Sequence, residues 1–210
     1  GCSELVTASF RNSYFNPKDY DKHGVALASA RAGNVIGGGD WAEDRLIPDF
    51  IRAILKEEKV QIRSPFALRP WQHVLEPLSG YLTLGAQLES DQRLLGESYN
   101  FGPKSEQNRT VLELLNDLSK QWNFENSENA YRITDNIPFH EAGLLKLNCD
   151  KALFHLRWEA NLTYKECVKM VGDWYYCFYK MDKDMYQFTL DQISQYETLA
   201  LERNLIWNQL

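Results

Sequence analysis

The chain has 210 residues, of which 44% are hydrophobic and 25% charged, a composition that excludes a disordered chain, a collagen-like repeat and a disulfide-dense miniprotein. Because 23 Lys and Arg stand against 29 Asp and Glu, the net charge is −6, which argues against nucleic acid or an anionic membrane surface as a partner. No apolar run approaches the roughly 20 residues that cross a bilayer, so we predict no membrane partner.

The first predicted element is a helix at the start of the chain. Gly1-Cys2-Ser3-Glu4 has no initiating Met, and no signal-peptide pattern follows it. Residues 4–11 have a helical pattern without a capping residue before them. We therefore expect a helix that begins before residue 1 and ends at Asn16-Pro17.

A short apolar segment follows, with a glycine-rich stretch after it. Residues 25–30 carry no charge and are predicted to form a buried strand of a parallel sheet. Residues 31–41 include Gly37, Gly38 and Gly39, which disfavour a strand, so we predict a loop. In open α/β sheets ligands bind at the carboxyl ends of the strands, which makes this loop a candidate binding segment.

Helices and strands alternate in the rest of the chain. Apolar periodicity and capping residues predict helices over residues 46–55, 78–88, 110–122, 150–156, 163–181 and 189–204. Short strands are expected over 60–62, 98–102, 131–134 and 144–147, and a loop over 123–130. This order predicts an α/β sheet with a smaller appended lobe.

Several catalytic classes have no support in the sequence. There is no GxSxG nucleophile motif, no P-loop and no dinucleotide-binding fingerprint. The histidines lack metal-ligand spacing, and the four cysteines form no CxxC pair, so we predict no metal site and reduced thiols. By itself the run of three glycines is equally compatible with a flexible surface connection.

The segment Arg69-Pro70-Trp71-Gln72-His73-Val74 is more informative. An arginine provides a fixed, charged fork for a pyrophosphate, and a tryptophan can stack on a base or sugar. The alternative is structural, with Arg69 paired to a carboxylate such as Glu76 and Trp71 in the core. A second polar pair, His140-Glu141, stands in a predicted turn and could be an ordinary solvated turn.

These motifs resemble those of the CDP-glucose 4,6-dehydratases, which are sugar-nucleotide enzymes of the extended short-chain dehydrogenase/reductase family. The resemblance runs almost end to end and corresponds to the C-terminal two thirds of those enzymes. It is carried by the following segments: 1–6, 28–41, 44–49, 69–77, 99–103, 140–142 and 189–193. The glycine-aspartate-tryptophan motif at 37–41 and the motif at 69–74 are typical of the branch that acts on CDP-sugars.

The resemblance implies roles for individual residues. Asn34 matches a contact to the substrate's phosphates or sugar, while Ala32 and Gly33 match positions that line the nicotinamide of NAD. Arg69 matches the arginine that binds the substrate pyrophosphate. Arg45 and Leu46, at the entry of the next helix, match groups that enclose the nucleotide.

The remaining implied substrate-binding residues are Trp71, His73, His140 and Glu141. No catalytic residue of this chain is implied, because in the family the Tyr-x-x-x-Lys pair and the NAD-binding glycine turn precede the position of Gly1. By itself the chain is therefore expected to be inactive. Arg157-Trp158 replaces a Gly-Trp that is usual in relatives, at an expected turn.

The resemblance also implies an organisation and an activity. Residues 1–37 would end an NAD-binding Rossmann domain, and 38–210 would form the substrate-binding lobe, with segments near 60–90 and 97–122 returning to the Rossmann part. The lobe would be mixed and mostly helical. The intact protein would be a cytoplasmic homodimer that converts CDP-glucose to CDP-4-dehydro-6-deoxyglucose, a precursor for surface polysaccharides. Two alternatives stay open: another epimerase or reductase of the family, or a noncatalytic nucleotide-sugar-binding remnant.

Overall fold

The computed structural model describes residues 1–122, 130–134 and 143–209. The helices are α1 (Cys2–Tyr14), α2 (Tyr20–His23), α3 (Leu46–Leu55), α4 (Leu75–Leu88), α5 (Val111–Gln121), α6 (Asp150–Leu156), α7 (Tyr164–Lys180) and α8 (Met185–Glu202). The strands are β1 (Ser29–Ala32), β2 (Asn34–Ile36), β3 (Val60–Ile62), β4 (Leu68–Arg69), β5 (Trp71–His73), β6 (Ser98–Phe101), β7 (Arg109–Thr110) and β8 (Tyr131–Ile133). Short 3-10 turns cover Pro17–Asp19, Gln92–Leu94, Ser105–Gln107 and Ile206–Gln209.

The described strands form four ladders of two. Three are parallel, β1 with β6, β2 with β5 and β3 with β8, and the β4–β7 ladder is antiparallel. β1 and β2 are separated only by Gly33, so one extended segment pairs first with β6 and then with β5. The parallel pairing and the alternation of strands with helices give the expected α/β class, in which parallel strands are joined through helical connections.

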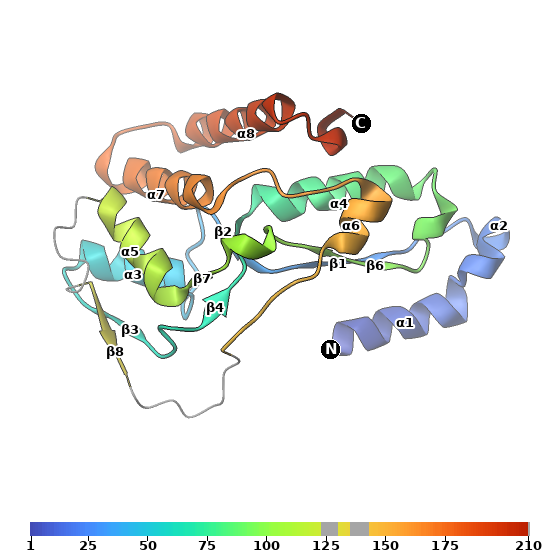
Figure 1. The fold of residues 1–210 in the computed structure, drawn as a ribbon, viewed down its shortest axis with the longest axis horizontal. Coiled ribbons are helices and arrows are strands. Elements are labelled where there is room, and N and C mark those ends of the chain that lie inside the picture. The colour runs from blue at the N-terminus through green and yellow to red at the C-terminus, as the bar shows by residue number, and fades with distance from the viewer. Residues whose placement is uncertain (123–129, 135–142, 210) are drawn as a thin grey trace.

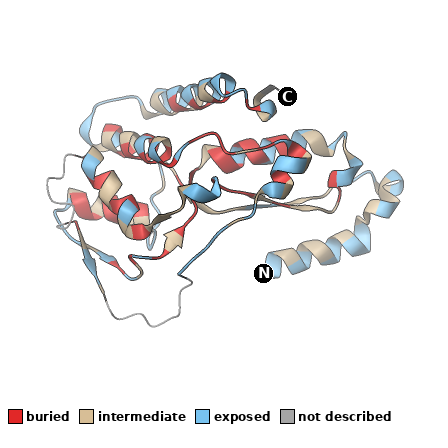
Figure 2. Cartoon of the chain, in the orientation of Figure 1, coloured by how far each residue is buried: buried red, intermediate tan, exposed pale blue. Residues whose placement is uncertain are grey.

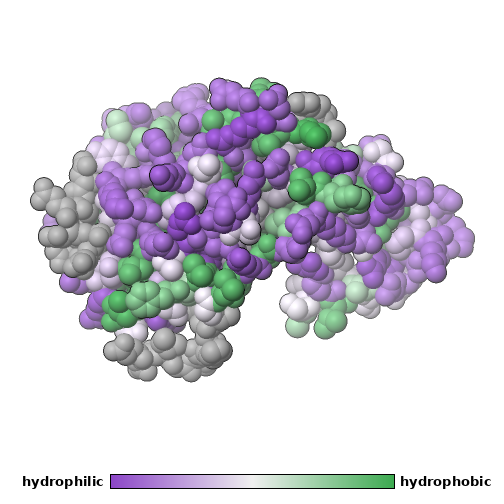
Figure 3. Space-filling view, viewed as in Figure 1, coloured by the Kyte–Doolittle hydropathy of each residue, from purple (hydrophilic) through white to green (hydrophobic). Residues whose placement is uncertain are grey.

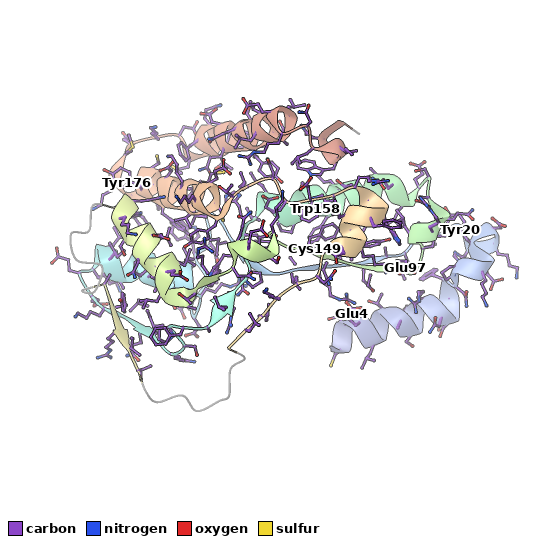
Figure 4. All side chains as sticks on the ribbon, in the orientation of Figure 1. Glu4, Tyr20, Glu97, Cys149, Trp158 and Tyr176 are labelled. Carbon is purple, nitrogen blue, oxygen red and sulfur yellow. The ribbon has the colours of Figure 1, made fainter. Side chains whose placement is uncertain are left out.

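Most of the core lies between the helices and these short strands (Figure 2). One cluster joins α3, α5 and α7, and it includes the fully buried Phe50, Leu114 and Val171. A second cluster joins β6, α4 and α6 around Trp158 (Figure 4), whose indole Nε1 donates to Ser79 Oγ at 3.0 Å. In Figure 1, α7 and α8 cover one side of the strands, whereas α1 lies at the edge of the fold, where Glu4 pairs with Arg31 and Arg11 donates to the Gly96 carbonyl.

Helix α1 has no buried residue. Its large apolar side chains Leu5, Val6, Phe10 and Tyr14 are 53–73% exposed. Much of the remaining surface in view is hydrophilic (Figure 3). Burial of apolar area normally supplies the main stabilisation of a helix in a folded domain, so α1 contributes little to the described core.

Local sequence signals explain most element boundaries. Helices α5 and α7 each begin with a complete capping box, Thr110 with Glu113 and Thr163 with Glu166. Helix α6 ends at Arg157, whose φ of 55° is the left-handed conformation common at helix ends. The turn expected at Arg157-Trp158 is therefore present.

Several expected boundaries were wrong. The strand predicted at 25–30 begins at Ser29, and its central residues Ala30 and Arg31 are exposed rather than buried. The loop predicted at 31–41 contains β2. The helix predicted at 78–88 begins at Leu75. Around Leu144 there is only an isolated parallel bridge to Leu68 where a strand was predicted.

The last helix also begins earlier than predicted. Its cap is Asp184, whose carboxylate accepts hydrogen bonds from the backbone N–H groups of Tyr186 and Gln187. Thr189, the expected cap, instead donates its hydroxyl to the Met185 carbonyl at 2.7 Å inside the helix. The first helix begins at Cys2 and ends at Tyr14, close to the predicted end at Asn16-Pro17.

Candidate functional site

A cavity of about 520 Å³ opens where β1 passes into β2. Its walls come from the end of the β1–β2 segment, the loop over residues 37–45, the first turn of α3 and the start of β5. The lining residues are Gly33, Asn34, Val35, Ile36, Gly37, Asp40, Arg45, Leu46, Ile47, Pro48 and Trp71. The cavity therefore lies beside the carboxyl end of a parallel strand, where α/β sheets bind ligands.

The cavity brings together five of the residues predicted from sequence, namely Gly33, Asn34, Arg45, Leu46 and Trp71. Ala32 precedes this group by one residue and is not part of the lining. Arg69 and His73, on either side of Trp71, are also not part of it. His140 and Glu141 lie outside the described residues.

The loop over residues 37–45 is anchored by aromatic packing. Trp41 contacts the rings of Trp174, Tyr175, Phe178 and Tyr179 on α7, with centroid distances of 4.9–6.0 Å. Aromatic pairs at these distances add stability beyond their buried area. Packing against α7 therefore fixes the position of this loop. No local sequence pattern predicts these contacts.

Hydrogen bonds fix the same loop. The Tyr175 hydroxyl donates to the Asp40 carbonyl at 2.8 Å. The Arg52 guanidinium donates to the carbonyls of Trp41 and Ala42 at 3.2 and 3.1 Å, and it also pairs with Asp49. Because these donors come from α3 and α7, the loop is held from two sides.

The three glycines serve packing in this structure. A Cβ at Gly37 would lie 2.9 Å from the Val74 side chain, and one at Gly38 would lie 2.1 Å from the Trp174 ring. Gly39 has a φ of 76°, which favours glycine. The glycine run is therefore a close-packed turn, so the interpretation as a flexible surface connection is wrong.

Polar groups of three kinds face the cavity. Asn34 supplies a side-chain amide, Arg45 a guanidinium and Asp40 a carboxylate. Arg45 Nη1 lies 3.8 Å from Asp40 Oδ2, and the arginine side chain is 65% exposed. Arg45 is also the N-cap residue of α3, and no side chain caps this helix. The first backbone N–H groups of α3 thus lie at the cavity wall, where an anion is favoured.

Trp71 and Arg69 have structural contacts of their own. Trp71 is 6% exposed, and its indole Nε1 donates to the Arg109 carbonyl at 3.2 Å. Arg69 is likewise 6% exposed and donates from Nη1 to the Leu68 carbonyl at 3.0 Å. Trp71 thus combines a core position with a face on the cavity.

His73 is buried behind the cavity. Its Nδ1 accepts a hydrogen bond from the Leu75 N–H at 3.3 Å, and only 3% of the residue is exposed. Burial lowers the pKa of His73 to about 4, so the imidazole is neutral near pH 7. Its location favours a structural role in orienting the start of α4.

Glu76 belongs to a separate buried network. Its two carboxylate oxygens accept the N–H groups of Asn161 at 2.9 Å and Leu162 at 2.5 Å, and the Tyr196 hydroxyl donates to it at 3.0 Å. Burial raises the pKa of Glu76 to about 7. This carboxyl therefore joins α4 to the segment before α7 and to α8.

Leu147 crosses the carboxyl ends of two strands. A Cβ at Gly33 or at Gly102 would lie 3.1 Å from Leu147 Cδ1. Cys149, which is labelled in Figure 4, lines a second cavity of about 620 Å³ together with Leu147. Leu147, Asp40, Trp174 and Tyr175 were not among the predicted site residues, because contacts between distant segments leave no local pattern.

Within residues 1–122, 130–134 and 143–209, no group of three or more His, Cys, Asp or Glu side chains is arranged to hold a metal ion. In the same part of the chain, no helix combines the length and the apolarity needed to span a membrane.

Comparison with known proteins supports the resemblance. No protein-family model matches the chain. It is 44% identical over 198 residues to CDP-glucose 4,6-dehydratase of Salmonella typhimurium, an alignment that covers 93% of the chain and 54% of that enzyme. The chain thus spans about half the length of this relative. The predicted resemblance to the CDP-glucose 4,6-dehydratases is confirmed, but the expected share of two thirds of those enzymes was too large, because the alignment covers 54% of this relative.

Solved structures confirm the fold. A dTDP-glucose 4,6-dehydratase from Streptomyces venezuelae, solved with NAD bound, superposes with a TM-score of 0.68 at 18% identity, over 85% of this chain and 49% of that one. A UDP-glucuronic acid 4-epimerase from Bacillus cereus gives a TM-score of 0.62 at 16% identity, over 76% and 48%. The fold of this chain is therefore the C-terminal part of a Rossmann-type parallel sheet with an appended, mostly helical lobe.

Proposed function

We propose that this chain supplies the nucleotide-sugar-binding part of a CDP-glucose 4,6-dehydratase. The observation that carries the proposal is the 44% identity over 93% of the chain. The cavity beside Asn34, Arg45 and the start of α3 supports it. The reaction would remove hydride from C4 of the glucose, expel water across C5 and C6, and return the hydride to C6.

In this proposal the cavity holds the diphosphate of the substrate. Arg45 carries a permanent positive charge that suits phosphate oxygens, and most of its side chain is accessible. The uncapped start of α3 adds backbone N–H donors and the positive end of the helix dipole, worth about 0.5–1 kcal/mol. The Asn34 amide can donate to a phosphate or accept from a sugar hydroxyl.

NAD is the cofactor of the proposed reaction, and when bound it would accept and return the hydride. The residues of this chain proposed to touch its nicotinamide are Ala32 and Gly33, at the carboxyl end of β1. Gly33 lines the cavity, and its missing side chain lets Pro70 and Leu147 pack within about 3.1 Å of the Cβ position. Because Pro70 and Leu147 fill the Cβ side of Gly33, a planar ring would reach the Gly33 backbone from the cavity, whose lining does not include Ala32.

The remaining predicted substrate contacts are kept as proposals, with different support for each residue. Trp71 has a face on the cavity and can stack on a base or sugar. Arg69 and His73 are buried beside it. Arg69 is kept as the proposed contact to the substrate pyrophosphate, and His73 as a proposed substrate-binding residue that also accepts a hydrogen bond from the Leu75 N–H at the start of α4. His140 and Glu141 are kept as proposed contacts near the nucleotide. The division of the chain at residue 37 into a Rossmann part and a substrate lobe is also a proposal.

We also propose that the intact protein is a homodimer that uses α1. The exposed apolar side chains of this helix, Phe10 among them, support a partner on that face. Light scattering after size exclusion would test this, and Phe10→Glu should lower the measured mass if α1 lies in the interface. An unchanged mass would remove α1 from the proposed interface.

Titration calorimetry with CDP-glucose tests binding. We expect Arg45→Met to weaken the affinity about tenfold or more and Asn34→Ala to weaken it less, because only the arginine contributes a charge. Glu43→Gln, at an exposed position of the same loop, is the control. Equal affinities for the wild type and Arg45→Met would contradict a diphosphate at this position.

The reaction class is tested by mass spectrometry of the product. The protein that contains this chain, supplied with NAD and CDP-glucose, should release a nucleotide sugar lighter by one water. A product of unchanged mass would indicate an epimerase, and binding without any product would favour a noncatalytic nucleotide-sugar-binding protein.

A further inference from the structure

Asp40 is the acidic residue in the lining of the cavity. A carboxylate next to bound phosphate would repel it, at a cost that increases where solvent is excluded. A carboxylate can only accept hydrogen bonds. Asp40 pairs with Arg45, and its carboxylate can in addition accept a hydrogen bond from a ligand that carries a neutral donor besides its phosphates.

The Asp40 carboxylate is held in one orientation. Oδ1 accepts the Ala42 N–H at 3.0 Å, and the backbone carbonyl of Asp40 accepts the Tyr175 hydroxyl at 2.8 Å. Oδ2 forms an ion pair with Arg45 Nη1 at 3.8 Å, a distance beyond that of a hydrogen bond, so the oxygen keeps its capacity to accept one. Among the described residues, none donates a hydrogen bond to Oδ2. The residue thus presents a fixed acceptor at the cavity.

We propose that Asp40 Oδ2 accepts a hydrogen bond from the exocyclic amine of cytosine and so selects cytidine over uridine nucleotides. The inference rests on the proposed function. Cytosine carries the N4 amino donor at the position where uracil and thymine carry the O4 acceptor. The lone pairs of a carboxylate attract the amine and repel the carbonyl oxygen, so one side chain both favours one base and rejects the other.

The substitution Asp40→Asn tests this, because it should change the affinities for CDP and UDP in opposite directions. The Ala42 N–H needs an acceptor, so the amide oxygen takes the place of Oδ1 and the NH₂ group takes the place of Oδ2. The position that faced the base then donates instead of accepting. We expect the affinity for CDP to fall about tenfold or more and the affinity for UDP to rise, measured by titration calorimetry.

A matched control separates base reading from charge. Glu43→Gln removes the same charge from an exposed position of the same loop, and it should leave the ratio of the two affinities unchanged. If Asp40→Asn changes the affinities for CDP and UDP by the same factor, Asp40 acts through its charge alone and the proposal is wrong.

Two analogues extend the test, and the first of them needs only the wild-type chain. CDP with two methyl groups on N4 has no donor there and should bind about tenfold or more weakly than CDP. The 2′-deoxy form keeps the amine and should remain sensitive to Asp40→Asn. Two results would show that the cytosine amine is not the partner and would overturn the proposal. One is that Asp40→Asn does not change the affinity for the 2′-deoxy form, and the other is that the dimethyl analogue binds as well as CDP.

Failure of the proposed function and failure of the base selection would give different binding results. A wild-type chain that binds neither CDP nor CDP-glucose would refute the proposed function, and the base selection would fall with it. A chain that binds CDP-glucose but accepts UDP and the dimethyl analogue equally well would refute only the role of Asp40.

Discussion

Trp174 occupies the space that a side chain at position 38 would need: a Cβ at Gly38 would lie 2.1 Å from Cγ and Cδ2 of the indole. The indole Nε1 donates to Thr189 Oγ1 on α8 at 3.0 Å, and the ring stacks on Phe178 at a centroid distance of 5.6 Å. Trp174 therefore cannot move away without disturbing the packing of α7 against α8.

Gly38→Ala should accordingly destabilise the protein by about 1–3 kcal/mol, the cost of forcing an extra methyl into a packed site. Urea unfolding measures this. Gly85→Ala is the matched control, because a Cβ there meets nothing within 4 Å at an exposed position in the last turn of α4, and it should stabilise by about 0.5–1 kcal/mol. A Gly38→Ala protein as stable as the wild type would show that the indole is not fixed.

Arg157→Gly should stabilise the protein by about 1 kcal/mol. Arg157 ends α6 with a φ of 55°, a conformation that costs a residue with a Cβ but not a glycine. Arg157→Ala keeps the Cβ and should give no such gain, which separates the backbone effect from loss of the guanidinium. The prediction fails if both variants shift the urea midpoint equally.

The free energy of unfolding should depend on pH through two buried groups, Glu76 and His73, whose effects run in opposite directions. The pKa of Glu76 is raised by burial to about 7, so between pH 4.5 and 7 the folded state keeps a proton that the unfolded state releases. Its contribution to stability is lost as the pH rises. The pKa of His73 is lowered by burial to about 4, so its contribution is lost as the pH falls from 6.5 to 4.

Single variants should reveal each response. In Glu76→Gln the unfolding free energy should fall as the pH is lowered from 6.5 to 4, with a slope of up to about 1.4 kcal/mol per pH unit from His73. In His73→Gln it should fall as the pH is raised from 4.5 to 7. Urea unfolding at half-unit intervals measures both. Variants whose pH profiles both run parallel to that of the wild type would contradict the buried environment of these groups.

The four cysteines should react at very different rates with a thiol reagent. Cys2 is exposed, Cys149 is partly buried, and Cys167 and Cys177 are buried. Burial raises the pKa of both Cys149 and Cys167 and lowers their thiolate fraction. We expect fast labelling of Cys2, slow labelling of Cys149, and labelling of the other two only in urea. Rapid modification of Cys167 in the native chain would be inconsistent with the packing of α7.

Elements defined by local signals were predicted well. Helix α3 has the expected bounds, because its apolar spacing and its Pro48 in the first turn are local features. The capping threonines at 110 and 163 gave correct starts for α5 and α7. β2, β4, β5 and β7 were missed because each is only two or three residues long and is stabilised by a partner distant in sequence.

The site was predicted only in part, because it too combines local motifs with contacts between segments that are distant in sequence. Gly33, Asn34, Arg45, Leu46 and Trp71 come from three separated segments, and it was their motifs that pointed to one site. Motifs could not separate residues that face the cavity from those behind it, so His73 was included although it is buried. Asp40 was visible within its motif, but its orientation depends on Tyr175, which lies 135 positions away.

The pairing of the segment formed by β1, Gly33 and β2 restricts motion at the cavity floor. Its first half is hydrogen-bonded to β6 and its second half to β5, and the Gly33 N–H continues the ladder to the Phe101 carbonyl at 3.3 Å. The Gln72 amide donates to that same carbonyl at 2.9 Å, which ties the two ladders together. Rotation of the β1–β6 ladder against the β2–β5 ladder would therefore break several backbone hydrogen bonds at once. The strand pairing at the cavity floor therefore resists rotation. The rate at which a ligand enters and leaves should depend on breaking the contacts that hold the loop over residues 37–45 to α3 and α7, rather than on rotation at this floor.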